Sequence, residues 1–447
     1  MAVFPIGIDR PVEHGGPLPL ACDVVVIGGG VVGVATALFL RRKGLAVALV
    51  EKGRIAGEQS SRNWGWIRAQ GRDQDEVPIA LEAQRLWQAL APELDTDIGL
   101  TRGGVTYITD SAKAMARFEA WAAKAGAHGL ATELIGADAV AARYPGMARA
   151  CLGAMVTPSD MRAEPWVAVP ALARLAAREG VAIVENCAAR RLDVTAGRVA
   201  GVVTEQARVR ANAVVLAGGA WSSLFLKAHG VWVPQLSVRS TVAATEQLPM
   251  VYAGGTGDDS IGFRPRRDGG YTLGSGMHDL YVGPSALRAA TKYLAALRAD
   301  AFSTRYHPAA PAGHPDAWGT KRQWGGDEQT PFERMRVLNP PPDPAALQHL
   351  ARHFGRLFPG FGPIRFRAAW AGMIDAMPDI VPVLDHCAAL PGLVIGTGLS
   401  GHGFGIGPGV GRVLADLATG GAAGHDLTRF RLSRFSDGSP MRPGPAL

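Results

Sequence analysis

The stretch that decides the fold is CDVVVIGGGVVGVATALFLRRKGLAVALVEK, residues 22–52. The four apolar residues Val24–Ile27 predict a strand that is buried on both faces of a parallel sheet. A glycine-rich turn and an apolar helix follow, and Val47–Val50 predict the next strand. A strand, a glycine turn, a helix and a second strand in this order predict a unit that grips a dinucleotide.

The turn contains the pattern G-x-G-x-x-G, formed by Gly28, Gly30 and Gly33. The first glycine allows the tight turn, the second lets the backbone approach a pyrophosphate, and the third lets helix and strand pack closely. Val31 and Val32 begin the helix, whose N-terminal N–H groups and positive dipole end face the phosphates.

An acidic residue, Glu51, stands at the end of the second strand and is followed by Lys52. A carboxylate at this distance from the glycines can accept hydrogen bonds from ribose hydroxyls, and it disfavours the 2′-phosphate of NADP. Two simpler readings compete: a glycine turn that only packs a helix on a strand, and a membrane span formed by the uncharged run 24–40. The three consecutive glycines and the charged residues 41–43 argue against the span.

Length and composition favour a two-domain protein. The 447 residues include 46 Lys and Arg against 39 Asp and Glu, which gives a formal net charge of +7, and the pI is about 9.4. No basic block is present, so we predict no nucleic-acid partner, while attraction of anionic substrates stays open.

The chain carries features expected of a cytoplasmic protein. The first 20 residues lack an apolar core, so no signal peptide is predicted. The cysteines have no C-x-x-C spacing and are expected to be reduced thiols; they stand at positions 22, 151, 187 and 387.

Apolar periodicity predicts several further elements. Helices are expected at 79–90, 166–177 and 345–358, strands at 104–109, 181–184, 213–216 and 393–396, and a hairpin within 191–209. Alternating segments at 237–244 and 271–274 indicate an antiparallel sheet. The predicted fold class is therefore α/β with an α+β two-domain arrangement, in which a Rossmann-type domain is joined to an antiparallel-sheet domain.

Three separated segments together resemble one known family. They are the G-x-G-x-x-G unit, ANAVVLAGGAWS at 211–222 and SGHGFGIGPGVGRVLADL at 400–417. In order and spacing they resemble the D-amino acid oxidase superfamily, which includes glycine oxidase, monomeric sarcosine oxidase, D-amino acid dehydrogenase and gamma-glutamylputrescine oxidase. The resemblance covers roughly residues 22–420 and implies non-covalently bound FAD.

The resemblance also implies a domain plan. The FAD-binding domain would be discontinuous, made of residues 20–78, 146–225 and 366–425. The substrate-binding domain would comprise 79–145 and 226–365, with terminal extensions at 1–19 and 426–447.

By the same resemblance, cofactor contacts fall in five further parts of the chain. The loop after the second strand would hold the ribityl chain and flavin ring, Ala189 would meet the adenine, and the turn near residue 400 would face the flavin pyrimidine. The residues expected to bind the cofactor in these parts are Ser60, Ser61, Arg62, Asn63, Trp64, Gly65, Ala189, Ala217, Gly218, Gly219, Trp221, Gly372, Gly398, Ser400, Gly401, His402, Gly403, Phe404, Gly405 and Ile406.

The resemblance implies oxidation of a C–N bond. An amino acid, secondary amine or polyamine-like substrate would give up a hydride equivalent to flavin N5 and form an imine that hydrolyses. Oxygen or an electron carrier would reoxidise the flavin, and the sequence leaves the choice and the oligomeric state open.

The expected substrate clamp is missing from its usual place. Close relatives carry an arginine in W-A-G-L-R-P that binds the substrate carboxylate, whereas this chain has Ile374 at that position. Arg264 or Arg266 could supply the charge instead. Asp375 suggests a cationic amine substrate, although it could equally be a structural cap before Met377.

Three further side chains are candidates for the reaction space. His402 lies between two glycines in the flavin-facing turn, where it could reach substrate or simply satisfy backbone groups. Trp66 and Tyr271 could wall the pocket or belong to the core. No metal site is predicted, and a covalent flavin link through Cys387 is not expected.

Two other functions remain as alternatives. One is FAD-dependent oxidation of a 2-hydroxy acid, which Arg264 and Arg266 would suit and Asp375 would not. The other is a flavin subunit of a multi-subunit opine or sarcosine oxidase, which the full-length second domain disfavours.

Overall fold

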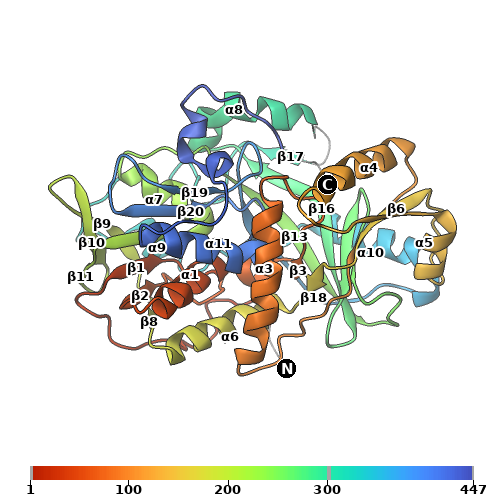
Figure 1. Cartoon of the computed structure of the whole chain (residues 1–447), viewed down its shortest axis with the longest axis horizontal. Coiled ribbons are helices and arrows are strands. Elements are labelled where there is room, and N and C mark those ends of the chain that lie inside the picture. The colour runs from red at the N-terminus through yellow and green to blue at the C-terminus, as the bar shows by residue number, and fades with distance from the viewer. Residues whose placement is uncertain (1–3, 300–303, 445–447) are drawn as a thin grey trace.

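The computed structural model describes residues 4–299 and 304–444, which build two large sheets at opposite ends of an elongated molecule (Figure 1). Helix α3 (Val77–Leu90) stands between them. The expected combination of a parallel and an antiparallel sheet is confirmed.

The first sheet has six strands in the order β19-β20-β12-β1-β2-β8. Five of them are parallel, and β19 pairs antiparallel at one edge. Their bounds are β1 (Val24–Ile27), β2 (Val47–Val50), β8 (Ala182–Val184), β12 (Ala213–Leu216), β19 (Val383–His386) and β20 (Leu393–Thr397).

Both faces of this sheet are covered, as the uninterrupted apolar strands predict. Val24 and Val26 belong to the core shared with α1 (Val31–Arg42), α6 (Pro165–Arg178) and α11 (Gly403–Ala418). Val25 and Ile27 belong to the opposite core. That core includes residues of α7 and of a small sheet where a hairpin was expected: β9 (Ala189–Thr195), β10 (Arg198–Thr204), β11 (Arg208–Arg210) and α7 (Ser222–Ala228).

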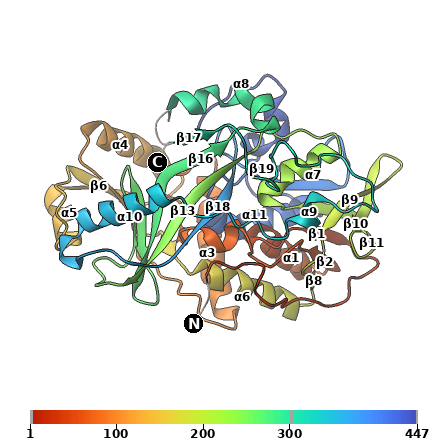
Figure 2. The ribbon, with the colours of Figure 1, turned by 180° about the vertical axis from the view of Figure 1, so that it is seen from behind.

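The second sheet has nine strands, and helix α10 lies across it (Figure 2). Most of its pairs are antiparallel, and β4–β14 and β16–β17 are parallel. The strands are β4 (Val105–Thr109), β5 (Glu133–Gly136), β6 (Gly153–Thr157), β13 (Leu236–Gln247), β14 (Gly255–Gly257), β15 (Ile261–Pro265), β16 (Gly270–Tyr281), β17 (Thr304–His307) and β18 (Phe366–Ala376).

Among residues 4–299 and 304–444, four helices accompany the nine-stranded sheet, and four short elements lie between the two sheets. The helices are α4 (Ala112–Gly126), α5 (Ala137–Arg143), α8 (Pro284–Ala299) and α10 (Pro344–Leu357). The short elements are α2 (Gln59–Arg62), β3 (Trp66–Ile67), β7 (Met161–Arg162) and α9 (Pro331–Arg334).

Two strands belong to a different sheet than the expected domain boundaries suggest. β6 and β18 belong to the nine-stranded sheet, although the boundaries 146–225 and 366–425 assign them to the FAD-binding part. β18 is a strand of the nine-stranded sheet, and the chain that follows it enters the six-stranded sheet as β19 and β20.

Glycines allow the helices to pack closely beside β1. A side chain at Gly407 of α11 would meet Val31 at 2.6 Å, and one at Gly411 would meet Ala35 at 2.6 Å. These contacts bring α11 against α1, so the N-termini of both helices lie close to the same end of the sheet. In the described part of the chain, no helix is long and apolar enough to cross a membrane.

Replacing Gly33 by alanine should destabilise the protein by about 1–3 kcal/mol. The new methyl group would lie 1.9 Å from the carbonyl oxygen of Gly28, so α1 must move away from β1. Urea unfolding followed by circular dichroism measures the loss. Gly126→Ala in α4, where a methyl group meets no atom within 4 Å, is the control and should be neutral or stabilising; equal effects of both changes would contradict the packing argument.

Candidate cofactor and substrate site

One long cavity runs from the glycine turn after β1 to the strands of the nine-stranded sheet. Its walls come from the carboxyl ends of β1, β2, β12 and β20, from the loop 56–68, and from β13 and β18. Crevices at the carboxyl ends of parallel strands are the usual ligand sites of such sheets.

The glycine turn forms one wall of this cavity. Gly28 has a φ of +109°, and a side chain on it would meet the carbonyl oxygen of Ala217 at 2.4 Å. Helix α1 begins after Gly30 without a side-chain cap. The first residues of this helix line the cavity, so its positive end fits the pyrophosphate of a dinucleotide.

Glu51 and Ser60 hold this turn in place. Glu51 accepts hydrogen bonds from the N–H groups of Gly29 and Gly53, both at 2.7 Å. Ser60 Oγ accepts one from the N–H of Val31 at 2.9 Å. Burial raises the pKa of Glu51 above its ordinary value, which the positive charge of Lys52 and these hydrogen bonds partly offset.

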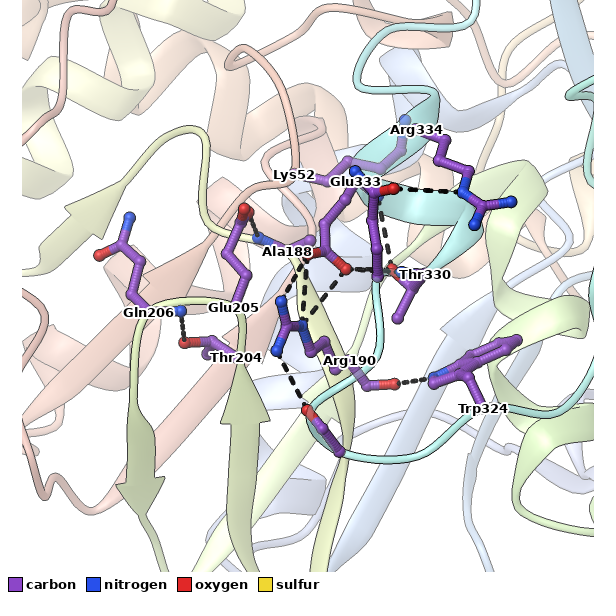
Figure 3. Close-up of polar contacts among 12 residues, drawn as sticks. Lys52, Ala188, Arg190, Thr204, Glu205, Gln206, Trp324, Thr330, Glu333 and Arg334 are labelled. Carbon is purple, nitrogen blue, oxygen red and sulfur yellow. Dashed lines mark hydrogen bonds and ion pairs between the residues drawn. The ribbon is translucent and has the colours of Figure 1, made fainter.

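Near Ala189, the segment 324–338 contributes Phe332 to the lining of the cavity. Figure 3 shows Arg190 reaching Glu333, with Nη2 2.7 Å from Oε1, while Trp324 donates to the carbonyl oxygen of Arg190. Thr330 and Glu333 form a capping box at the start of α9. The segment is thus tied to β9 by charged and neutral hydrogen bonds.

At the other end, the turn between β20 and α11 faces the nine-stranded sheet. Asp375 of β18 accepts hydrogen bonds from the N–H groups of Gly398 and Leu399, at 2.9 and 3.2 Å. Burial raises the pKa of Asp375 to about 6. Asp375 therefore fixes the turn that leads into α11, and it also lines the cavity.

Beside this turn the cavity is lined by two arginines, Arg68 and Arg72. Arg68 donates from Nη1 to the carbonyl oxygen of Gln70 at 2.7 Å and lies over the rings of Trp66 and Tyr107, at 5.6 and 5.3 Å. Arg72 is 3% exposed and has an Nη1 atom with no hydrogen-bond partner among the described residues.

His402 faces these arginines from the start of α11. Its side chain is 16% exposed and lines the cavity, whereas its Nδ1 atom is buried without a described hydrogen-bond partner. Burial and the charges of Arg72 and Arg68 hold the pKa of His402 well below its ordinary value, so the ring is neutral.

Most residues predicted to bind the cofactor line this cavity. Those in its walls are Gly28, Gly30, Val31, Val32, Glu51, Lys52, Ser60, Arg62, Asn63, Trp64, Ala189, Ala217, Gly218, Gly219, Trp221, Gly372, Ser400, Gly401, His402, Gly403 and Phe404. Those behind the walls are Gly33, Ser61, Gly65, Gly398, Gly405 and Ile406. Of the substrate-side predictions, Trp66, Asp375 and His402 are in the lining.

Three predicted substrate residues lie elsewhere. Arg264 is 0% exposed and pairs with both carboxylate oxygens of Glu164, at 2.8 and 3.0 Å. Arg266 donates to the carbonyl oxygens of Tyr271 and Thr245. Tyr271 is 1% exposed, and its hydroxyl donates to the carbonyl oxygen of Pro249. Arg264 and Arg266 are therefore not a carboxylate clamp, and Tyr271 is a core residue.

The ion pair of Arg264 has a structural role instead. Arg264 also donates to the carbonyl oxygen of Trp64, so the pair supports the loop that lines the cavity. Burial opposes ionisation of Glu164, but the charge and hydrogen bonds of Arg264 lower the pKa of that carboxyl below its ordinary value.

Other lining residues were not singled out from the sequence. Arg68 ends the predicted flavin loop, residues 60–68, but was given no role, and Arg72 lies four residues further along the chain. The available signal was this pair of arginines after W-G-W-I. Ser240 and His278, from the nine-stranded sheet, gave no signal because only the fold brings them to the cavity. Cys387 is 2% exposed in the core and is absent from the lining.

With this geometry established, comparison with known proteins identifies the class. A family model described as "FAD dependent oxidoreductase", named DAO, matches residues 23–417. The chain belongs to this family, whose cofactor is FAD, and the glycine-lined cavity with two helix N-termini has the donor groups that this cofactor requires.

The names of several relatives describe enzymes that act on amines or amino acids. N-methyl-L-tryptophan oxidase from Salmonella arizonae is 26% identical over 93% of this chain and 99% of its own. Sarcosine dehydrogenase from Mus musculus is 24% identical over 94% of this chain, which spans only 42% of that protein's length. L-amino acid deaminase from Proteus myxofaciens, solved with anthranilate, superposes with a TM-score of 0.91 at 28% identity, covering 97% of this chain and 98% of its own.

Replacing Arg264 by methionine should destabilise the protein by about 3–5 kcal/mol, because Glu164 would be left buried and unpaired. Adding Glu164→Leu should recover much of that loss. Denaturant unfolding measures both variants, and Arg267→Met, which removes an exposed ion pair, should cost less than about 1 kcal/mol. A selective loss of substrate affinity in the Arg264 variant at full stability would contradict the structural role.

Proposed function

We propose that this protein uses FAD to oxidise the C–N bond of an amino acid or N-alkyl amino acid to an imine, which water then hydrolyses. The observation that carries the proposal is the pair Arg68 and Arg72 in the cavity wall beside the flavin-facing turn. When bound, the cofactor supplies the acceptor for the hydride equivalent, and the protein has to hold the substrate at the correct carbon.

The two guanidinium groups favour a substrate that carries a carboxylate. Arginine offers planar donors that match carboxylate oxygens in pairs. The rings of Trp66 and Tyr107 and the Gln70 carbonyl fix the plane of Arg68. Burial, followed by the charge of Arg68, lowers the pKa of Arg72, and a bound carboxylate would relieve this repulsion.

The part of the wall that β18 forms offers no second clamp for a carboxylate. Ile374 lies against Gly401, since a side chain on that glycine would meet it at 3.6 Å. The Oδ2 atom of Asp375 accepts hydrogen bonds from two backbone N–H groups of the β20–α11 turn, whereas its Oδ1 atom is buried with no hydrogen-bond partner among the described residues. The support for a carboxylate-bearing substrate over the polyamine-like one that Asp375 suggested is therefore the pair Arg68 and Arg72.

The relatives support the same substrate class. Sarcosine, N-methyl-L-tryptophan and L-amino acids, which their names specify, all join an amine to a carboxylate. Anthranilate, present in the structure of the Proteus deaminase, likewise has an amino group close to a carboxylate. We also infer that the six-stranded sheet, with its helices, forms the FAD-binding domain and that the nine-stranded sheet forms the substrate-binding domain.

A panel of amines under anaerobic conditions tests the proposal. Sarcosine, L-proline, N-methyl-L-tryptophan and L-phenylalanine represent carboxylate-bearing amines, and putrescine and spermidine represent polyamines. We expect at least one of the former to bleach the flavin absorbance and the polyamines to leave it unchanged. Bleaching only by polyamines, or only by 2-hydroxy acids such as lactate, would refute the proposed substrate class.

Arg68→Gln and Arg72→Gln should each lower kcat/KM for the reactive amino acid about 10- to 100-fold, because each removes charged hydrogen bonds to the carboxylate. The loss should appear mainly in KM, with the amount of bound FAD unchanged. Steady-state kinetics and the flavin absorbance measure the two effects. The control is Arg85→Gln, on the exposed face of α3, and a similar loss there would remove the argument for a clamp.

A further inference from the structure

Glu76 has a buried carboxyl group close to His402, and the contacts described so far give this group no structural role. Glu76 immediately precedes α3 and is 1% exposed, and neither of its carboxylate oxygens makes a hydrogen bond among the described residues. Burying a carboxylate without hydrogen bonds is costly, so such a group in a folded protein needs an explanation.

Glu76 and His402 face each other across a short gap. The Oε2 atom of Glu76 is 3.9 Å from Nδ1 of His402, and both atoms lack a described hydrogen-bond partner. A movement of about 1 Å would bring the two atoms to hydrogen-bond distance. The exposed part of the imidazole meanwhile lies in the cavity wall, beside Arg68 and Arg72.

We propose that Glu76 stores the proton that the substrate ammonium group gives up before oxidation, and that His402 passes this proton on. This inference deepens the amine oxidation proposed above and rests on it. An amine can release a hydride equivalent from the neighbouring carbon only when its nitrogen carries a free electron pair, whereas amino acids bind at neutral pH as ammonium ions.

The transfer balances within these two side chains. One N–H bond of the substrate ammonium breaks, its electron pair stays on the nitrogen, and the proton binds Nε2 of His402. The proton on Nδ1 of the same ring moves to Oε2 of Glu76. The ring is then neutral again with its two nitrogens exchanged, and the positive charge of the ammonium has cancelled the negative charge of Glu76.

The surroundings favour the carboxyl group as the final holder. Burial raises the pKa of Glu76, which the charge of Arg72 partly offsets and the charges of Asp73 and Asp379 increase further. The pKa of His402 is lowered instead, so a proton that reaches the ring does not stay there. Asp379 itself is paired with Arg434 at 2.8 Å.

Other ionisable groups around the pair face Arg72 rather than Glu76. Asp160 and Tyr107 both act on the charge of Arg72. Asp160 accepts hydrogen bonds from the N–H of Ala69 and from Gln84, both shorter than 3 Å, so its carboxylate is already engaged. Among these groups, Glu76 is the acid whose oxygens face His402.

Glu76→Gln keeps the shape of the side chain and removes its ability to take up a proton. The holoenzyme is assayed between pH 6 and 10 with the carboxylate-bearing amine of the panel that reduces the flavin fastest. We expect kcat/KM at pH 7 to fall about 10- to 100-fold and to recover as the pH approaches the pKa of the free amine. Asp75→Asn, an exposed neighbouring acid, is the matched control and should keep the wild-type profile.

Thermal unfolding without substrate gives a readout that does not depend on turnover. The folded pKa of Glu76 lies above the ordinary value of 4.5, so the folded state keeps its proton to higher pH than the unfolded state. Stability therefore falls as the pH rises above 4.5, and Glu76→Gln should remove this fall, raising Tm at pH 8 relative to pH 5 by about 2–4 °C. Asp75→Asn should not.

Different failures have different meanings. An unchanged pH profile of kcat/KM, or an unchanged dependence of Tm on pH, in Glu76→Gln would overturn the role of Glu76 while leaving the amine oxidation intact. If no carboxylate-bearing amine of the panel reduces the wild-type flavin, the proposed function fails, and the unfolding curves still decide whether Glu76 holds a proton in the folded protein.

Discussion

The contact between α1 and β1 is the constraint on which the rest of the site depends. Because Gly33 has no side chain, the backbone of α1 lies close to the carbonyl oxygen of Gly28, the residue directly after β1. This approach aims the start of α1 at the cavity. The glycines at 407, 409 and 411 then let α11 pack on α1 and α3 at similar closeness, so a second helix start reaches the other end of the same cavity. Two positive helix ends on one cavity suit a cofactor that carries a pyrophosphate and becomes anionic on reduction.

The loop 56–76 connects this cofactor frame to the nine-stranded sheet. Its first part supplies Ser60 to the glycine turn, and its later part supplies Arg68 and Arg72 to the opposite end of the cavity. A loop that serves both ends needs firm support. The buried pair of Arg264 and Glu164 gives it, because the pair binds the loop at the Trp64 carbonyl from the sheet side. Charges are expensive to bury, so this pair contributes a fixed geometry more than a net gain in stability.

Features formed by residues close in sequence were predicted well, whereas contacts between residues far apart in sequence were predicted poorly. The residues of the β1–α1–β2 unit are close in sequence, and their spacing alone predicts the turn, the helix and the acidic residue after β2. The structure confirms this unit. Arg264 was misplaced because strand alternation cannot show which face of β15 meets Glu164, a residue 100 positions away. Arg68 and Arg72 were overlooked for the converse reason: they are near the motif in sequence, but only the packing of α11 and β4 around them leaves their guanidinium groups at a cavity.

The same distinction explains the exchange at Ile374. From the sequence, the isoleucine at the place of the clamp arginine indicated a clamp that is missing or supplied from elsewhere, with Arg264 or Arg266 as candidates. In the structure, Ile374 presents an apolar wall to Gly401, while cationic groups stand on the loop 66–72 instead. A carboxylate anchored by Arg68 and Arg72 would lie in the same cavity as His402, whose pKa is lowered by burial and by the charges of these two arginines. In the proposed mechanism, carboxylate binding and proton transfer are therefore coupled. The charges of Arg68 and Arg72, which bind the carboxylate, also lower the pKa of His402. The proton is therefore held by Glu76, whose Oε2 atom lies 3.9 Å from Nδ1 of His402.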